Sequence, residues 1–315
     1  MISPKVSVIV PNYNHAPYLR QRLDTIFYQT FQDFEVIILD DCSTDNSKEI
    51  IEEYRIYSRV SHIVYNEKNS GSPFKQWARG FEFAQGEYIW IAESDDWADL
   101  NFLKTMVPYL EKEEQTVLTF CGSFWSYKDK IINKSPFLTD FTISGRVFSR
   151  KWMVEHNSIY NASCVLFKKS VLKHISDEYK TYKGCGDRQF WLEVCWQGNV
   201  HYQSNPLNYF RQHCTSTTQN QIANGNAYKE MMRVFKFAKK NKIVSPFMKL
   251  SIPVFFLNYL EKNQNLLQTN PETYHYLRNE WKKEVPFYAV SRIIVFVGYW
   301  IWVFLSFFKK RKNLL

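Results

Sequence analysis

The chain opens on Val6-Ser7-Val8-Ile9-Val10-Pro11-Asn12-Tyr13-Asn14, and its fold follows from this segment. The first five residues are mostly β-branched and apolar, which is typical of a buried strand. Pro11 has no amide hydrogen, so we expect the strand to end near it. Apolar residues then recur at helical spacing over 17–29, beginning with Leu19. This opening predicts a strand, a polar loop and a helix in succession.

Strand and helix continue to alternate to about residue 120. Further strands are expected at 34–39, 61–65, 88–92 and 117–120, and the helices between them at 45–58 and 73–84. This alternation predicts an α/β fold in which a mostly parallel, Rossmann-like sheet carries helices on both faces. Ligands of such sheets bind beyond the carboxyl ends of the strands. We therefore expect four polar segments to line one crevice, namely 11–15, 40–43, 66–71 and 93–97.

The remainder of the chain is less regular and suggests a change of architecture. Helical spacing returns at 227–240 and at 246–262. We therefore predict an α/β domain over 1–220, followed by a helical C-terminal region over 221–315.

Composition narrows the class of protein. The chain has 315 residues and a formal net charge of +9, and 17% of its residues are aromatic. Such a basic surplus suits nucleic acid, an anionic membrane or phosphorylated ligands, but no nucleic-acid-binding motif occurs, so no nucleic-acid partner is expected. HExxH, P-loop and GxGxxG motifs do not occur, which disfavours zinc proteases, P-loop NTPases and dehydrogenases. Six cysteines without CxxC spacing indicate a reducing cytosolic compartment.

The acidic run Glu93-Ser94-Asp95-Asp96 directly follows the strand expected at 88–92. Carboxylates this close repel one another unless a cation or hydrogen-bond donors balance them. Mg²⁺ and Mn²⁺ take oxygen ligands, often one or two carboxylates completed by phosphate oxygens. The run therefore fits a divalent-cation site, and it equally fits a solvated turn that caps a helix.

Three further segments carry candidate site residues. Tyr13 could stack on a nucleobase and Asp41 could accept a hydrogen bond from a ligand, but both also fit ordinary turns. Asp187 follows a glycine-rich turn and precedes an apolar helix, so it fits a helix cap or a general base. Arg211 and His213 precede hydroxyl residues in a segment that suits a diphosphate or a solvated loop.

Taken together, these segments resemble the family 2 glycosyltransferases, which have the GT-A nucleotide-sugar fold. The matching segments are Val6–Asn14, Gln29–Asp45, Asn69–Gly71 and Ala84–Asp96, in the family's order and spacing. The resemblance implies an inverting transferase that moves a sugar from a nucleotide diphosphate sugar, most often a UDP-sugar, to an acceptor hydroxyl. It also implies a donor-binding half up to about residue 120 and an acceptor half over 121–220. No QxxRW element is present, which argues against a processive synthase.

The resemblance assigns the donor side of the site. Pro11 and Tyr13 would line the nucleobase pocket, and Asp41 would bind the edge of the base. Glu93-Ser94-Asp95 would form the DxD element. Asp95 would reach a Mn²⁺ or Mg²⁺ ion, and Glu93 or Ser94 would approach the ribose.

The resemblance also assigns the chemistry and the acceptor side. Asp187 would be the catalytic base that removes the acceptor's proton. His213 would contact the metal ion or the diphosphate, and Arg211 would bind the diphosphate. Asp96 and Trp97 would contact the acceptor or support the acidic element from behind, and Asp96 is also the fallback ligand for the metal ion.

The sequence departs from the family's pattern in three places. Cys42 stands where glycine is usual, and Glu93 stands where the element usually begins with aspartate. Gly186 replaces the acidic residue that usually precedes the catalytic aspartate. The last two departures support an alternative, a catalytically inactive nucleotide-sugar-binding or scaffold protein on the same fold.

The segment 285–315 suggests a membrane surface as a further partner. Residues 293–308 carry no charge, and Lys309-Lys310-Arg311-Lys312 follow them. As a helix this run would be about 24 Å long, short of the roughly 30 Å of a bilayer core. We therefore expect either an interfacial helix on anionic lipid or a helix packed on the domain. By family analogy, the former suits a glycan or lipid-linked acceptor in bacterial surface polysaccharide biosynthesis, with a peripheral or monotopic enzyme at the cytoplasmic side of the plasma membrane.

Overall fold

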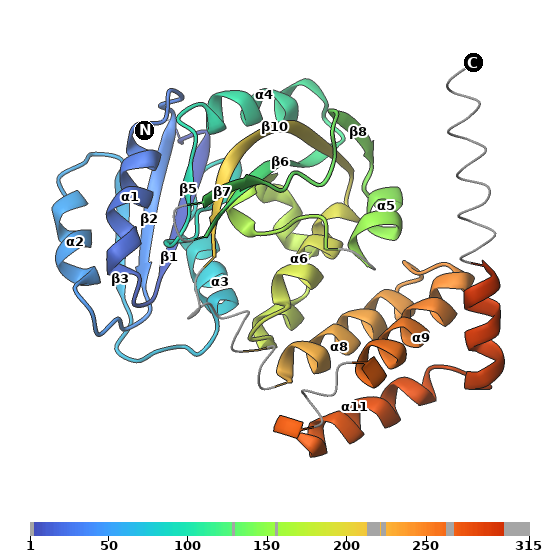
Figure 1. Ribbon diagram of the computed structural model, residues 1–315. Helices are drawn as coiled ribbons and strands as arrows, with labels where there is room; N and C mark the ends of the chain where they lie inside the picture. The colour runs from blue at the N-terminus through green and yellow to red at the C-terminus, as the bar shows by residue number, and fades with distance from the viewer. Residues whose placement is uncertain are drawn as a thin grey trace. The chain divides into compact units, whose positions relative to one another are not determined.

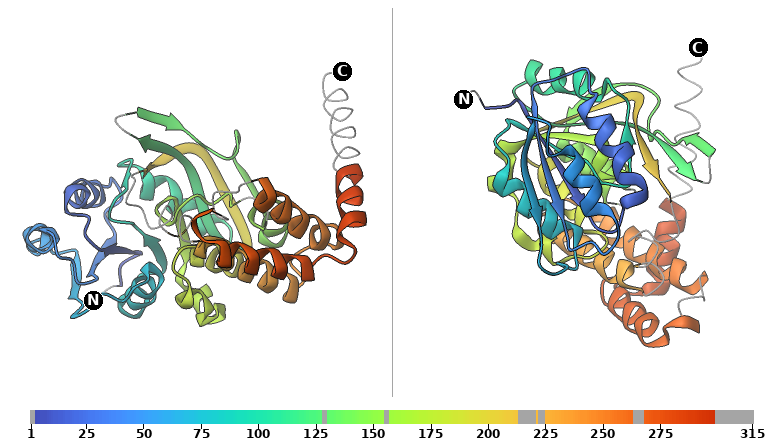
Figure 2. Two further views of the ribbon diagram at one scale, coloured as in Figure 1. Left: turned by 60° about the horizontal axis from the view of Figure 1, so that its bottom comes forward. Right: turned by 90° about the vertical axis from the view of Figure 1, so that its left-hand side faces the viewer.

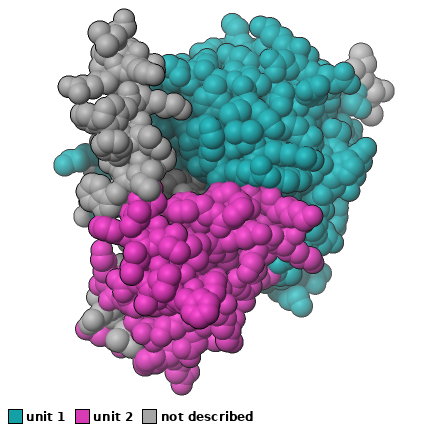
Figure 3. Space-filling view, turned by 90° about the vertical axis from the view of Figure 1, so that its right-hand side faces the viewer, with its two compact units in different colours: residues 1–219 teal, residues 220–315 magenta. Residues whose placement is uncertain are grey.

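The computed structural model describes residues 3–127, 130–154, 157–212, 221, 225–262 and 268–298. It divides the chain into two compact units, residues 1–219 and 220–315, which Figure 3 colours separately. The sequence suggested the change of architecture between 220 and 221. The division of the first unit into donor-binding and acceptor halves stays a prediction.

The first unit is built on one mixed sheet (Figure 1). Its strands are β1 (Val6–Asn12), β2 (Phe34–Asp40), β3 (Val60–Tyr65), β4 (Tyr88–Ile91), β5 (Trp97–Ala98), β6 (Thr116–Tyr127), β7 (Lys130–Asn133), β8 (Phe141–Ser144), β9 (Val165–Lys168) and β10 (Asn199–Arg211). Their order is β3-β2-β1-β4-β9-β6-β10-β5, and β7 pairs with β6 and β8 with β10. The helices are α1 (Ala16–Phe27), α2 (Ser47–Tyr54), α3 (Pro73–Phe83), α4 (Phe102–Lys112), α5 (Gly145–Phe148) and α6 (Gly186–Cys195).

The predicted α/β fold is confirmed by the first four strands of this order. β1 pairs in parallel with β2 and with β4, and β2 pairs in parallel with β3. Every residue of β1 and β2 is buried, which explains their continuous apolar runs. Helices lie on both faces of this part of the sheet (Figure 2). The parallel strands thus bring their carboxyl ends to one edge.

The sheet differs from the expectation beyond β4. The strand expected at 117–120 is the start of β6, and it does not lie next to β4. β9 is inserted between them and runs antiparallel to both. β10, which the sequence did not indicate, lies parallel to β6 with register shifts around Pro206. Pro206 has no amide hydrogen to donate, and its neighbours Ser204 and Asn205 interrupt the apolar alternation of a strand.

The second unit is helical. Its helices are α8 (Asn226–Lys240), α9 (Pro246–Lys262) and α11 (Pro271–Lys283), and residues 288–298 are also helical. Trp281 of α11 is fully buried, with its ring 4.6 Å from Phe256 of α9 and 5.3 Å from Phe235 of α8. Over the described residues, none of the helices has the length and apolar character needed to span a bilayer. Most of the predicted membrane segment, residues 299–315, lies outside the described residues.

Candidate functional site

Four loops meet at the carboxyl edge of the parallel strands, as the sequence predicts. The amide of Asp41 after β2 donates to the carbonyl of Asn12 at the end of β1 over 2.9 Å. Asn66 after β3 donates from Nδ2 to the Asp41 carboxylate at 2.7 Å. His15 Nδ1 lies 2.8 Å from Ser94 Oγ in the loop after β4. Hydrogen bonds therefore tie all four loops into one rim.

Asp41 is buried, and donors of the protein hold its carboxylate. Oδ1 accepts hydrogen bonds from Asn66 Nδ2 at 2.7 Å, from the Ser70 amide at 2.9 Å and from Gln76 Nε2 at 2.7 Å. Oδ2 accepts from Ser70 Oγ at 2.8 Å. These four donors match the roughly four acceptor positions of a carboxylate. The assigned contact with a nucleobase stays a prediction, and the structure adds that Asp41 joins two loops to α3.

The residues assigned to the nucleobase pocket differ in exposure. Pro11 is buried in β1 beside its register partner Leu39. It lies beyond Ile9, the last residue of β1 that pairs with β4, so its missing amide hydrogen costs the sheet little. Tyr13 is 45% exposed just past the strand. Its ring is accessible for stacking, whereas Pro11 lies beneath the rim.

Cys42 has a φ of +64°, in the left-handed region that favours glycine. The residue follows Asp41 at the turn after β2. The backbone here therefore explains why glycine is the usual residue at this position. From the sequence, cysteine in place of glycine at position 42 has no apparent consequence. The structure shows that it places a side chain on a residue with a positive φ.

The amide, the carbonyl and the carboxylate of Glu93 each form a hydrogen bond. Its amide donates to Ser163 Oγ at 3.1 Å, and its carbonyl accepts from Arg22 Nε at 2.9 Å. Its Oε1 accepts from the indole Nε1 of Trp77 at 2.8 Å. Burial and the nearby Asp95 carboxylate raise the pKa of Glu93 to about 8. Glu93, which stands where the family usually has aspartate, thus accepts a hydrogen bond from the indole of Trp77 on α3.

Asp96 supports the acidic run from inside the unit. It is buried, and its carboxylate accepts from Asn161 Nδ2 at 2.6 Å and from the Arg211 amide at 3.0 Å. Burial and the adjacent Asp95 carboxylate raise the pKa of Asp96 to about 7, and the Arg22 charge opposes them. Of the roles suggested for Asp96, these contacts favour support of the run, and the other roles stay predictions. Ser94, assigned to the ribose, is also buried.

Arg22 belongs to this site, and the sequence analysis missed it. Its side chain is fully buried, and within the described part of the chain Nη1 and Nη2 have no hydrogen-bond partner. The charges that act on it most strongly are those of Asp96, Asp95 and Glu93. Burial lowers the pKa of Arg22 to about 10, so it remains a cation at neutral pH. The signal was an arginine three residues after Leu19, on the apolar face of the first helix.

Arg211, at the end of β10, lies between aromatic rings. Its guanidinium carbon is 4.5 Å from the ring of Tyr18 and 4.5 Å from that of Trp97. Its Nε donates to the carbonyl of Asp95 at 2.8 Å. Trp97 in turn stacks on Tyr209, with ring centroids 4.9 Å apart. Arg211 therefore fastens the acidic run to α1, and its contact with a diphosphate stays a prediction, as does the contact of Trp97 with an acceptor.

Asp187 lies in the first turn of α6, where the helix dipole favours a carboxylate. The cap residue is Cys185, so Asp187 is not the helix cap that the sequence also allowed. A Cβ added at Gly186 would lie 2.6 Å from the Phe74 ring and 2.8 Å from the carbonyl oxygen of Tyr179. This close packing explains why no acidic residue precedes Asp187 here.

One helix, α3, connects the donor loops to the helix that carries the candidate base. Gln76 donates to Asp41, and Trp77 donates to Glu93. Phe74, one turn earlier, packs at the start of α6. Trp77 is 2% exposed and lies against Phe190 and Trp191 of α6, so it is a core residue.

The fit to a metal ion rests on the acidic run. His213 lies outside the described residues. Among the residues that the structure describes, no three His, Cys, Asp or Glu side chains are grouped to hold an ion. Asp95 is half-buried at the rim between Glu93 and Asp96, whose carboxylates accept hydrogen bonds from Trp77 and Asn161. One rim carboxylate suits a hard cation that is also bound by phosphate oxygens of a ligand.

Curated proteins similar to this chain are glycosyltransferases of bacterial origin. Glycosyltransferase GlyG of Streptococcus pneumoniae is 33% identical over 144 residues, which cover 45% of this chain and 47% of GlyG. The putative teichuronic acid biosynthesis glycosyltransferase TuaG of Bacillus subtilis is 34% identical over 119 residues, 38% of this chain and 46% of TuaG. The matched part of this chain therefore spans less than half of the length of either relative.

A solved structure and a family description complete the comparison. A fragment of Staphylococcus aureus TarS in complex with UDP-GlcNAc matches 90% of this chain and 82% of its own, with a TM-score of 0.69 and 22% identity. This likeness confirms the GT-A fold. The sequence model described as Glycosyl transferase family 2 matches residues 7–176, more than half of the chain. The chain therefore belongs to glycosyl transferase family 2.

Proposed function

We propose that this protein transfers a sugar from a UDP-sugar to a hydroxyl of a glycan or lipid-linked sugar, with inversion at the anomeric carbon. The observation that carries the proposal is the attachment of Asp41, Glu93 and the start of α6 to one helix, α3. This arrangement joins the assigned donor loops to the assigned base. Family membership supports it, as do the UDP-GlcNAc complex of TarS and the naming of TuaG for teichuronic acid biosynthesis.

In this proposal Asp187 removes the proton of the acceptor hydroxyl as the oxygen attacks the anomeric carbon. The bond to the UDP oxygen breaks on the opposite face, so the configuration inverts. The position of Asp187 in the first turn of α6 favours its ionised form, which a general base needs. The absence of an acidic neighbour at Gly186 leaves this base without a second carboxylate beside it in sequence.

The leaving diphosphate requires positive charge. A Mn²⁺ or Mg²⁺ ion held by Asp95 and the donor would supply Lewis-acid stabilisation of the departing UDP. The protein's own part is to keep Asp95 in place. Arg211 holds its carbonyl, and the neighbouring residues Glu93 and Asp96 are anchored to Trp77 and Asn161. A basic group at His213 would act on the same diphosphate.

A panel of donors tests the proposal. The shift in unfolding temperature is measured with UDP-, GDP- and dTDP-sugars, with and without Mn²⁺, and donor hydrolysis is followed in parallel. We expect UDP-sugars to give the largest shift, Mn²⁺ to increase it, and hydrolysis to follow. Binding without hydrolysis or transfer would instead identify the protein as an inactive nucleotide-sugar-binding scaffold. A shift that does not depend on the metal ion would remove Asp95 from its assigned role.

A further inference from the structure

The basic surplus of the chain belongs entirely to its second unit. Residues 220–315 contain sixteen Lys and Arg against five Asp and Glu, whereas residues 1–219 contain 24 against 26. The first unit is therefore close to neutral. A surplus of this size on so short a segment attracts a negatively charged partner at low salt.

The same unit exposes apolar side chains on the segment that follows α11. The segment presents six side chains that are each at least 49% exposed, namely Phe287, Val290, Ile293, Ile294, Phe296 and Val297. Phe287, Val290, Ile294 and Val297 recur every three or four residues, which is the spacing of one helix face, and we call these four residues the stripe. Only Ser291 and Val295 of residues 287–298 are buried, and Arg292 is the sole charged residue among them. A helix that is apolar on its outward side suits a neighbour other than water.

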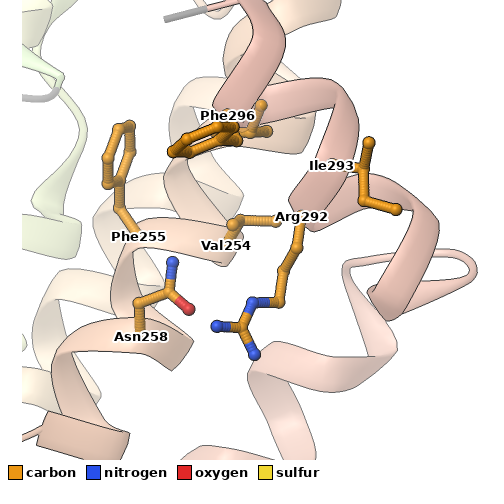
Figure 4. Close-up of a pocket in the computed structure, with 7 residues that line it drawn as sticks. Val254, Phe255, Asn258, Arg292, Ile293 and Phe296 are labelled. Carbon is orange, nitrogen blue, oxygen red and sulfur yellow. The ribbon is translucent and has the colours of Figure 1, made fainter.

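This apolar surface continues onto α9. A hollow of about 390 Å³ is lined by residues of α9 and of the helical segment 288–298. Figure 4 shows the rings of Phe255 and Phe296 near one end of the hollow, and the guanidinium of Arg292 beside Asn258 at the other. Phe247, in the first turn of α9, is also exposed. The surface thus combines aromatic and aliphatic side chains with an edge at which Arg292 pairs with Glu261 over 3.8 Å.

We propose that this surface of the second unit docks on an anionic lipid bilayer. Apolar side chains of the stripe would enter the boundary between head groups and acyl chains, and the basic residues of the unit would face the head groups. This inference goes beyond the transfer reaction and does not depend on it.

Charge selects the bilayer over other occupants. A second copy of the unit would bring sixteen basic residues against sixteen, which opposes pairing. Nucleic acid would use the charge but would leave the apolar stripe in water. An anionic membrane surface satisfies both features at once, because it offers negative charge above and hydrocarbon below.

The test is flotation of the full chain with phosphatidylcholine vesicles, with and without phosphatidylglycerol. We expect the chain to float with the anionic vesicles only, and less so as salt is raised. Replacing three stripe residues in one variant, Phe287→Ser, Ile294→Ser and Val297→Ser, should weaken the partition at least about tenfold. The matched control replaces two exposed apolar residues of the first unit, Ile56→Ser and Leu138→Ser, and should float like the parent.

Four results would overturn the docking proposal. Three of them are failure of the parent chain to bind anionic vesicles, an equal loss of binding in the control, and full binding by the stripe variant. The fourth is a dimer of the parent chain, measured by sedimentation, that the stripe substitutions dissociate, because the surface would then bind a second copy. The UDP-induced unfolding shift of each variant reports on the first unit alone. Loss of vesicle binding with an intact shift therefore separates this proposal from the proposed reaction.

Discussion

The two units of this chain differ in how many charged side chains they bury: among the described residues the second unit buries Glu230, whereas the first unit buries several. In the first unit Arg22, Asp41 and Asp96 are buried, next to opposite charges or several hydrogen-bond donors. In the second unit ion pairs such as Lys239–Glu284 lie at the surface, around a core that includes Trp281. Burying a charge costs free energy, and a stable fold can form without buried charges. This difference agrees with the two proposals made above, which place the transfer chemistry in the first unit and the docking surface on the second.

The largest expected effect is on turnover. Asp187→Asn should lower kcat about 10²–10⁴-fold, because an amide cannot take the proton of the acceptor hydroxyl. Binding of the UDP-sugar should be unchanged, since the assigned donor loops do not include α6. Steady-state kinetics with a titration of donor binding checks both. Normal turnover in this variant would place the general base elsewhere and break the contrast between the units.

The next effect is on stability, and it compares the two units directly. Arg22→Met should destabilise the first unit by about 3–5 kcal/mol, because it leaves buried carboxylates without their counter-charge. Lys239→Met, which removes a surface ion pair of the second unit, should cost about 1 kcal/mol or less. Urea unfolding of the full chain measures the difference.

Arg22→Lys is the control that keeps the positive charge but removes the planar guanidinium group. It keeps the cation but loses the planar Nε contact to the Glu93 carbonyl, so it should fall between the parent and Arg22→Met. Equal losses for Arg22→Met and Lys239→Met would show that burial does not distinguish the charges of the two units.

A smaller effect tests the packing behind Asp187. Gly186→Ala adds a Cβ that would meet the Phe74 ring and the carbonyl oxygen of Tyr179. We expect a loss of about 1–3 kcal/mol in the free energy of unfolding and a shift of α6 that lowers kcat. Pairing the change with Phe74→Leu should recover part of the loss if the ring is the main obstacle. An unperturbed Gly186→Ala variant would mean that α6 is free to move.

The smallest effect concerns the strained turn at the rim. Cys42→Gly should raise stability by about 0.5–1 kcal/mol, because glycine adopts a positive φ without the steric cost that Cys42 bears. Thermal unfolding measures the gain. Replacing Cys195, which is buried in α6, by glycine is the opposite control and should destabilise. A loss in Cys42→Gly would show that the cysteine side chain contributes more than its backbone costs.

The sequence predicts the donor side of the fold well, for a physical reason. β1 and β2 are continuous apolar runs because both faces of each strand are covered, and such runs stand out in a sequence. β10 was not predicted, since Ser204 to Pro206 interrupt its pattern and register shifts absorb them. α11 was not singled out because its buried residues, such as Leu277 and Trp281, alternate with many polar ones.

The candidate site is predictable in its residues but not in their orientation. The acidic run and Asp187 could be named from their positions after a strand and before a helix. That Glu93 would bond to Trp77, and that Arg22 would lie under the run, depends on how α1 and α3 pack on the sheet. An arginine in an apolar helix face is more often assigned to the surface, where its charge is solvated.

The anchoring of Asp96 has a practical consequence for chimaeras within the family. Asp96 stands in the early part of the chain, yet its hydrogen-bond donors, Asn161 and Arg211, come from the later part. A hybrid spliced near residue 120 would therefore inherit the assigned donor loops from one parent and the residues that hold the acidic run in place from the other. Such a graft needs a compatible pair at 161 and 211, so the assigned donor loops cannot be exchanged as a cassette that stops short of β10.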